Sequence, residues 1–145
     1  MLIPAFSTRR HGDLGIGDTL GMREWIDWAA GHRVGFLQLL PINENGTDES
    51  PYSGISSIAL DPIYLSFDGG EIPFITRAET EAARSSLGAH LNAHLIDYPA
   101  VRTAKNHLLE ISFARFMADP NPLLDREFQA FRDRSTAWLP DYCLF

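Results

Sequence analysis

The chain has 145 residues and a mass of 16.2 kDa, and its 45% hydrophobic and 21% charged residues are typical of one folded domain rather than of a disordered, collagenous or coiled-coil chain. Twelve Lys and Arg against nineteen Asp and Glu give a net charge of −7, which argues against nucleic acid as a partner. The single cysteine, Cys143, excludes an internal disulfide, and no apolar run approaches the roughly 20 residues that span a membrane, so we expect a cytoplasmic protein with no membrane partner.

The first 40 residues predict a strand, a helix and a second strand. Leu2 to Phe6 is a short apolar run, expected to be a buried strand, and a glycine-rich loop from Gly12 to Gly17 follows it. Asp18 is the expected N-cap of an amphipathic helix from Thr19 to Ala30. Val34 to Leu40 is expected to be a strand buried on both faces. This order predicts a βαβ unit, the building block of the α/β class with a parallel sheet.

The second half of the chain is predicted to be helical. A further short strand is expected at Ile63 to Phe67, and the glycines at positions 69 and 70 then mark a break. We therefore expect two parts, residues 1–69 and residues 70–145. The expected helices of the second part are Thr80 to Leu95, Tyr98 to Ala118 and Leu124 to Trp138. The aromatic, apolar ending at Phe145 predicts that the chain is cut short at its C-terminus.

Polar side chains gather in the two loops that follow the predicted strands, Ser7 to Gly17 and Pro41 to Gly54. In parallel α/β sheets such loops lie at the ligand-binding end of the strands. The second loop carries Asn43, Ser50 and Tyr52 beside two acids, a combination that suits a sugar, since sugars offer apolar faces to aromatic rings and hydroxyls to polar groups. The competing interpretation is an ordinary solvated loop, and adjacent acids cannot form a catalytic pair.

Other sites are weaker candidates. The glycine-rich loop has the spacing G-x-x-G-x-G, which differs from both common phosphate-binding motifs, so a tight turn competes with a nucleotide site. His90 and His94 are spaced by one helical turn, but no glutamate follows His90 and no third ligand is in view, so we predict no metal site. No nucleophile elbow for a serine hydrolase is present either.

Several runs of residues in combination resemble the 4-alpha-glucanotransferase family, also called amylomaltase, disproportionating enzyme or glycoside hydrolase family 77. The runs are Gly15-Ile16-Gly17-Asp18, Trp28-Ala29-Ala30, Leu37-Gln38-Leu39-Leu40-Pro41-Ile42-Asn43, Ser50-Pro51-Tyr52-Ser53, Ala59-Leu60-Asp61-Pro62-Ile63-Tyr64-Leu65, Lys105-Asn106-His107-Leu108-Leu109 and the segment from Trp138 to Phe145. The likeness covers nearly the whole chain. In many members of the family Asp precedes and Gln follows the Ser-Pro-Tyr motif, whereas Glu49 and Ser53 stand there in this chain.

The resemblance implies a TIM-type barrel with helical insertions, a fold that needs about 250 residues for the barrel alone. The 145 residues would supply the opening βα units and part of a helical insertion, and thus an incomplete barrel. Its unpaired strand edge and exposed helix faces predict self-association. In the family the tyrosine of the Ser-Pro-Tyr motif contacts a glucose near the cleaved bond, which implies Tyr52 and Ser50 as substrate-binding residues, with Asn43 on the same loop.

The resemblance also implies a reaction: a retaining transfer of alpha-1,4-glucan segments between maltodextrins, glycogen or starch, without a cofactor. The family's three catalytic carboxylates lie on later barrel strands, so no catalytic residue is assigned here and the chain alone is predicted to be inactive. Two alternatives stay open. One is a noncatalytic fragment that binds glucan or is only a remnant. The other is nucleotide binding by the glycine-rich loop.

Overall fold

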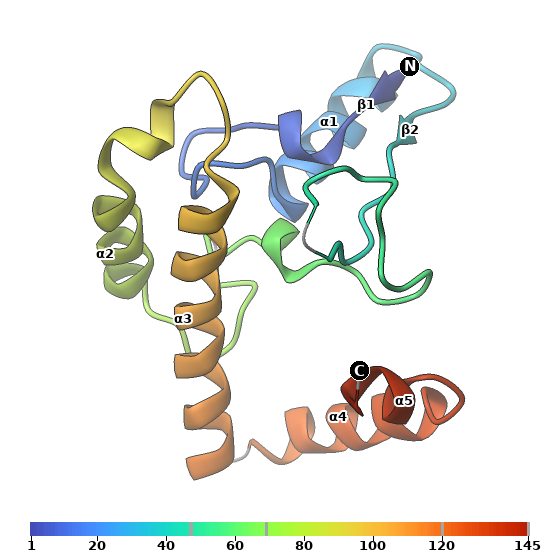
Figure 1. Cartoon of the computed structure of the whole chain (residues 1–145), viewed down its shortest axis with the longest axis vertical. Helices are drawn as coiled ribbons and strands as arrows, with labels where there is room; N and C mark the ends of the chain where they lie inside the picture. Colours follow the sequence, from blue (N-terminus) through green and yellow to red (C-terminus); the bar gives the residue numbers. More distant parts are fainter. Residues whose placement is uncertain (47, 69, 120, 145) are drawn as a thin grey trace.

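The protein, described by a computed structural model over residues 1–46, 48–68, 70–119 and 121–144, combines a small parallel sheet with a helical remainder (Figure 1). Strand β1 (Leu2–Ile3) pairs in parallel with β2 (Gln38–Leu39), and helix α1 (Thr19–Gly31) connects them. The predicted βαβ unit is therefore confirmed. Among the described helices, none is long and apolar enough to cross a membrane.

Both strands are shorter and more exposed than predicted. After β1 the chain turns at Pro4 into a 3-10 helix, η1 (Ala5–Ser7), because proline has no amide hydrogen to continue a ladder. The prediction of a strand buried on both faces from Val34 to Leu40 is wrong over most of its length, since Phe36 is 70% exposed and only Gln38–Leu39 pairs.

Helix α1 begins where the sequence places it. The Asp18 carboxylate accepts a hydrogen bond from the Gly21 amide at 2.9 Å, which satisfies one of the free donors at the helix N-terminus. Steric requirements explain the glycines before the helix. Gly12 and Gly15 adopt φ values of 98° and 87°, and a Cβ on Gly17 would lie 2.1 Å from a carbonyl oxygen of η1. The loop is thus a tight turn packed against η1.

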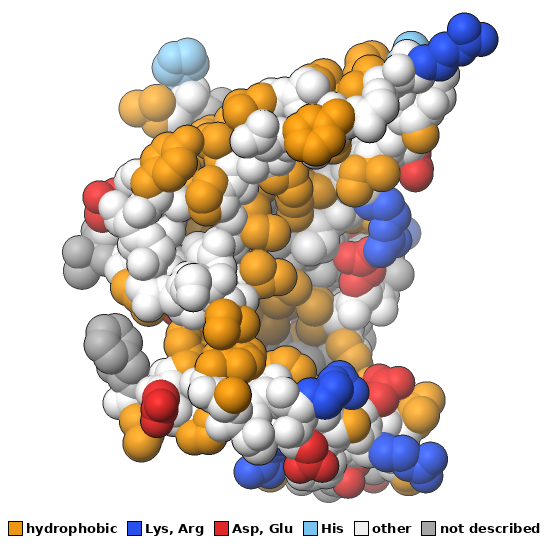
Figure 2. Space-filling view, turned by 90° about the vertical axis from the view of Figure 1, so that its right-hand side faces the viewer, with side chains coloured by type: hydrophobic (Ala, Val, Ile, Leu, Met, Phe, Trp, Pro, Cys, Tyr) orange, Lys and Arg blue, Asp and Glu red, His pale blue; other side chains and the backbone are white. Residues whose placement is uncertain are grey.

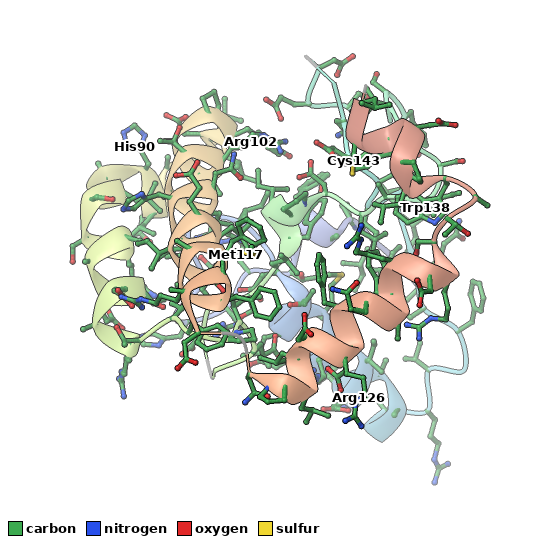
Figure 3. All side chains as sticks on the ribbon, turned by 90° about the horizontal axis from the view of Figure 1, so that it is seen from below. His90, Arg102, Met117, Arg126, Trp138 and Cys143 are labelled. Carbon is green, nitrogen blue, oxygen red and sulfur yellow. The ribbon has the colours of Figure 1, made fainter. Side chains whose placement is uncertain are left out.

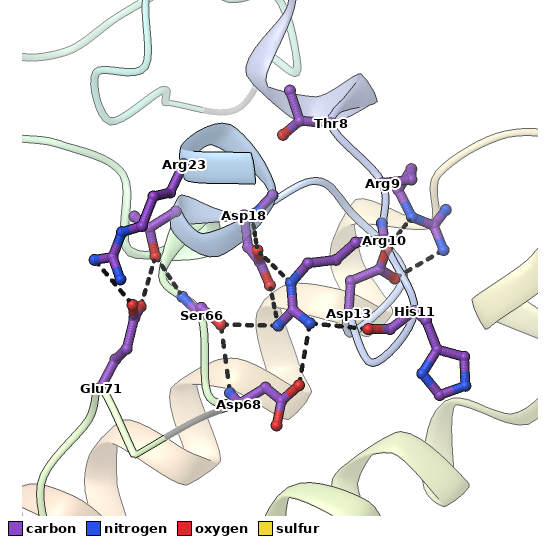
Figure 4. A network of polar contacts seen from close by, with 12 residues as sticks. Thr8, Arg9, Arg10, His11, Asp13, Asp18, Arg23, Ser66, Asp68 and Glu71 are labelled. Carbon is purple, nitrogen blue, oxygen red and sulfur yellow. Dashed lines mark hydrogen bonds and ion pairs between the residues drawn. The ribbon is translucent and has the colours of Figure 1, made fainter. Parts of the chain in front are cut away.

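A buried arginine connects this loop to the middle of the chain (Figure 4). Arg10 bonds the Asp18 carboxylate at 3.2 Å, Asp68 at 3.0 Å and the Ser66 hydroxyl at 3.1 Å. Because the Arg10 side chain is only 7% exposed, its charge is taken up by protein groups rather than by water. The network therefore fixes the start of α1 against residues 66–68.

The helical half contains α2 (Arg77–Leu87), the 3-10 helix η3 (Gly88–Asn92), α3 (Tyr98–Ala118), α4 (Pro122–Arg134) and α5 (Leu139–Leu144). Helix α3 has the predicted bounds. Helix α2 starts earlier than predicted because Thr76 and Glu79 form a capping box, and it ends earlier because Gly88 has a φ of 48°. The predicted last helix, Leu124 to Trp138, corresponds to α4, which ends already at Arg134, and α5 was not predicted.

The strand predicted at Ile63 to Phe67 is not formed. A 3-10 helix, η2 (Pro62–Tyr64), capped by Asp61, takes its place. The backbone carbonyls of Ile63 and Leu65 accept hydrogen bonds from the Lys105 side chain of α3 instead of from a neighbouring strand. A side chain on a distant helix thus replaces the sheet partner that a strand would need.

Helix α3 packs against two groups of buried apolar residues. One group joins it to the N-terminal part and the other joins it to α2. The first comprises Ala5, Ile16, Met22, Ile63, Tyr64 and Val101, and the second comprises Leu14, Phe67, Leu87 and Leu108. Helices α4 and α5 lie apart from both groups and extend from the C-terminal end of α3 (Figure 1). There the ring centroids of Phe116 on α3 and Phe128 on α4 are 5.8 Å apart. Figure 2, turned by 90° about the vertical axis from Figure 1, shows a band of apolar side chains down the face toward the viewer.

Candidate functional site

The loop that follows β2 folds back on itself as an irregular hairpin, which we call the 42–61 hairpin. Its two arms are joined by three backbone hydrogen bonds, from the Glu44 amide to Ala59 at 3.1 Å, from Ile55 to Glu44 at 2.8 Å and from Asp61 to Ile42 at 3.0 Å. The hairpin leaves the carboxyl end of β2. This is the end at which parallel α/β sheets hold their ligands.

The tip of the hairpin carries the Ser-Pro-Tyr motif in a hydrogen-bonded turn. Asp48 accepts hydrogen bonds from the Ser50 amide and, at 2.8 Å, from the Ser53 hydroxyl, and these bonds lower the pKa of Asp48. The Ser50 hydroxyl in turn accepts from the Tyr52 amide at 3.3 Å. Tyr52 is 75% exposed, so its ring projects from a turn whose backbone is already bonded.

Asn43 lies at the other end of the same hairpin. It pairs with Leu60 in an isolated antiparallel bridge, and its amide group donates to the Ala59 carbonyl at 3.3 Å. The structure therefore places the three predicted site residues on one hairpin, with Ser50 and Tyr52 together at the tip and Asn43 at the base.

The base of the hairpin is held by an ion pair that sequence reasoning missed. The guanidinium of Arg102 on α3 donates two parallel hydrogen bonds of 2.9 Å each to the Asp61 carboxylate, whose side chain is 1% exposed. Figure 3 labels Arg102 on α3. Burial and the nearby Asp61 carboxylate raise the pKa of Glu44, an effect that Arg102 opposes. Burial also raises the pKa of the Tyr64 phenol to about 12, and it raises the pKa of the Tyr98 phenol as well.

A buried lysine completes the attachment to α3. Lys105 is 1% exposed, and its Nζ donates to the carbonyl oxygens of Ile63 at 2.5 Å and Leu65 at 2.8 Å. Burial lowers the pKa of Lys105 to about 8, although the carboxylates of Asp18 and Asp13 act in the opposite direction. A signal for it exists in the sequence. Lys105 stands four residues after Val101, inside the apolar stripe of α3.

Among the described residues, the structure does not form the two other candidate sites in the sequence, a metal site at His90 and His94 and a phosphate site in the glycine-rich loop. In the described part of the chain no three His, Cys, Asp or Glu side chains are grouped to hold a metal ion. His90 lies in η3 and bonds Asp97 at 2.8 Å, while His94 lies beyond η3, so the two do not share an α-helix. In the glycine-rich loop, the amides of Gly15 and Gly17 already donate to Asp13 and Phe6, which leaves neither of them free to cradle a phosphate.

Comparison with known proteins gives the family. The sequence model of glycoside hydrolase family 77, described as 4-alpha-glucanotransferase, matches residues 3–145. The chain belongs to this family. The match includes α1, β2, the 42–61 hairpin and the helical half, so the resemblance to the family is confirmed.

Three curated relatives carry the name 4-alpha-glucanotransferase. The enzyme of Chlamydia caviae is 32% identical over 144 residues, which is 99% of this chain and 27% of the relative. The rice protein DPE2 is 31% identical over 99% of this chain and 15% of its own length, and the Synechocystis enzyme is 28% identical over 100% of this chain and 28% of its own length. The chain thus spans between about a seventh and just over a quarter of the length of these relatives.

Proposed function

We propose that this chain is the opening part of a 4-alpha-glucanotransferase that transfers alpha-1,4-glucan segments between maltodextrin chains by a retaining mechanism. The observation that carries the proposal is the 42–61 hairpin. It leaves the carboxyl end of a parallel strand and holds the Ser-Pro-Tyr motif in a bonded turn with Tyr52 75% exposed. A rigid aromatic ring at that position suits the apolar face of a glucose unit.

Each predicted site residue has a separate role in the proposal. Tyr52 stacks on a glucose ring of the glucan, and Ser50 sets the direction of that ring through its hydrogen bond to the Tyr52 amide. Asn43 holds the base of the hairpin through Ala59, and its amide oxygen is offered to a sugar hydroxyl. Maltodextrins, glycogen or starch are the proposed substrates, and the proposed reaction uses no cofactor.

We propose further that residues 1–69 form the first βα units of a TIM-type barrel and that residues 70–145 belong to a helical insertion. Position 69 lies outside the described residues. The parallel pairing of β1 with β2 across α1 supports the first part of this division, and the run of helices from α2 onward supports the second.

The proposed catalytic carboxylates belong to other parts of the full-length enzyme. A retaining transfer needs two carboxyl groups about 5 Å apart across the cleaved bond. Two acids of the hairpin have other partners, since Asp48 bonds the turn at the tip and Asp61 bonds Arg102. We therefore expect no transfer when the purified 145-residue chain is incubated with maltotriose and the products are separated by chromatography. Appearance of glucose together with longer maltodextrins would show that the chain is active by itself.

Binding of maltoheptaose tests the glucan site directly. We expect Tyr52→Ala to weaken binding about fivefold in an NMR titration, because an aromatic stacking contact contributes about 1 kcal/mol. Phe113→Ala is the matched control, since Phe113 is also an exposed aromatic, at 58%, but lies on α3. Equal binding by the wild type and Tyr52→Ala would contradict the assignment of Tyr52.

Self-association is part of the same proposal. The strand edges of a two-stranded sheet and exposed apolar groups such as Phe36 and Ile26 would be covered by neighbours in a complete barrel. Sedimentation velocity should show association that increases with concentration, and a monomer at all concentrations would count against the incomplete barrel. The intact mass of the natural product separates an enzyme from a noncatalytic glucan-binding fragment, because the enzyme predicts a mass several times 16.2 kDa.

A further inference from the structure

We infer that Arg102 and Lys105 of α3 are positioning residues that fix the 42–61 hairpin, and with it the Ser-Pro-Tyr turn, to the helical half of the protein. The inference rests on the proposed function in one respect, namely that Tyr52 contacts glucan. Its structural basis is separate, because it concerns the bonds between α3 and residues 61–65.

Both residues project from one face of α3. They are three positions apart in the helix, so their side chains lie side by side. Arg102 binds the Asp61 carboxylate, and Lys105 binds the carbonyls of Ile63 and Leu65, two to four residues further along the chain. Two neighbouring side chains of α3 thus hold a continuous segment that begins where the hairpin ends.

Asp61 connects this clamp to the pairing of the hairpin arms. Its carboxylate receives Arg102, while its backbone amide donates to Ile42 at 3.0 Å and so closes the base of the hairpin. The carboxylate also accepts from the Ile63 amide at 3.0 Å, which fixes η2. Asp61 therefore bonds Arg102, the opposite arm of the hairpin and η2 at the same time.

Removing Arg102 leaves an unfavourable arrangement at this base. The Asp61 side chain is 1% exposed, and a buried carboxylate without its cation is strongly destabilised. Burial and, after it, the charge of Asp61 raise the pKa of Glu44 on the opposite arm, while Arg102 lowers it. Without the guanidinium the two carboxylates repel across the hairpin, and we expect the arms to separate before the helices do.

Arg115 provides a matched control on the same helix. Its guanidinium also forms a two-pronged ion pair, with Glu79 at 2.6 and 3.0 Å, and it donates to the carbonyl of Phe74 at 2.6 Å. These contacts connect α3 to α2 and to the segment before it, not to the hairpin. A purely structural role predicts similar consequences for the loss of either arginine.

The experiment compares Arg102→Gln and Arg115→Gln in the 145-residue chain. NMR hydrogen exchange is followed at the amides of Glu44, Ile55 and Asp61, which carry the hairpin bonds, with the Leu108 amide in α3 as reference. We expect Arg102→Gln to accelerate exchange of the three hairpin amides at least tenfold relative to the reference, and Arg115→Gln to change the same ratio less than twofold. Equal ratios in the two variants overturn the inference.

Maltoheptaose supplies the functional readout. We expect Arg102→Gln to weaken the chemical-shift response of the Tyr52 ring to maltoheptaose at least threefold, and Arg115→Gln to respond like the wild type. Arg102→Lys should lie between Arg102→Gln and the wild type, because lysine keeps the charge but not the paired bonds. Unchanged binding in Arg102→Gln overturns the positioning role. If wild-type Tyr52 shows no response, the proposed function fails, while the exchange ratios still decide the clamp. If Arg102→Gln does not fold, Arg102→Lys is measured by the same exchange ratio, and no acceleration there refutes the clamp.

Discussion

Lys105 gives the sharpest prediction about stability. Burial lowers its pKa from 10.5 to about 8, so the folded protein releases this proton at a lower pH than the unfolded chain does. Between these two values the unfolded state binds more protons, and the free energy of unfolding must therefore rise with pH. Each pKa unit corresponds to about 1.4 kcal/mol, so the whole window is worth roughly 3 kcal/mol.

The perturbation is Lys105→Met, which keeps an unbranched side chain but has no group that titrates. We expect the stability of the wild type relative to this variant to increase by about 2.5 kcal/mol between pH 7 and pH 10, because most of the window is then crossed. At pH 7 the variant loses two hydrogen bonds to buried carbonyls but is also relieved of a buried charge, so the two effects oppose each other there.

The assay is urea unfolding of both proteins at pH 7, 8, 9 and 10, followed by circular dichroism. Tyr64 and Tyr98 have raised pKa values, so their ionisation reduces stability only above about pH 10. Both proteins contain these tyrosines, so their contribution cancels in the difference between wild type and variant. A difference between wild type and variant that stays constant over this range would refute the reasoning. It would mean that Lys105 titrates at its ordinary pKa and that the folded chain gives water access to its amine.

Three further predictions concern the local structure. Hydrogen bonds from Arg115 on α3 and from Thr76, the N-cap of α2, lower the pKa of Glu79 to about 2. The ionised Glu79 therefore stabilises the protein fully above pH 4.5, and this stabilisation is lost as the pH falls toward 2. Glu79→Gln should remove this acid dependence in urea unfolding between pH 5 and 2.5. Gly17→Ala should destabilise the protein by about 3 kcal/mol, because its Cβ would meet a carbonyl oxygen at 2.1 Å, whereas Gly31→Ala, which meets nothing within 4 Å, should leave the melting temperature unchanged or slightly higher. Leu108→Ala should cost about 3 kcal/mol in the core, while Leu144→Ala at 87% exposure should change the free energy of unfolding by less than about 0.5 kcal/mol, and similar losses in both would show that the α3 core is not closely packed.

Local signals explain the helices that the sequence predicted well. Helix α1 begins at its Asp18 cap, and α3 runs over the predicted residues from Tyr98 to Ala118. In both cases the capping group and the apolar spacing lie within one stretch of the chain, so the information needed to place the helix is local. The start of α2 was missed although its capping box, Thr76 and Glu79, stands in the sequence.

The strands depended on contacts that are distant in sequence. A short apolar run becomes a strand only if a partner lies beside it, and the segment from Ile63 to Phe67 meets the Lys105 side chain instead. The same holds at the N-terminus, where Pro4 and the close approach of Gly17 to η1 end β1 after two residues.

By itself the sequence determined the family, the βαβ order and the Ser-Pro-Tyr motif, because these depend on residue identity and on short-range patterns. Only the tertiary structure decided how the 42–61 hairpin is held. A buried lysine and an arginine on α3, some 40 residues further along the chain, bond its final segment. No local pattern pairs Asp61 with Arg102, because their meeting depends on how α3 packs over η2, and packing is a property of the whole chain.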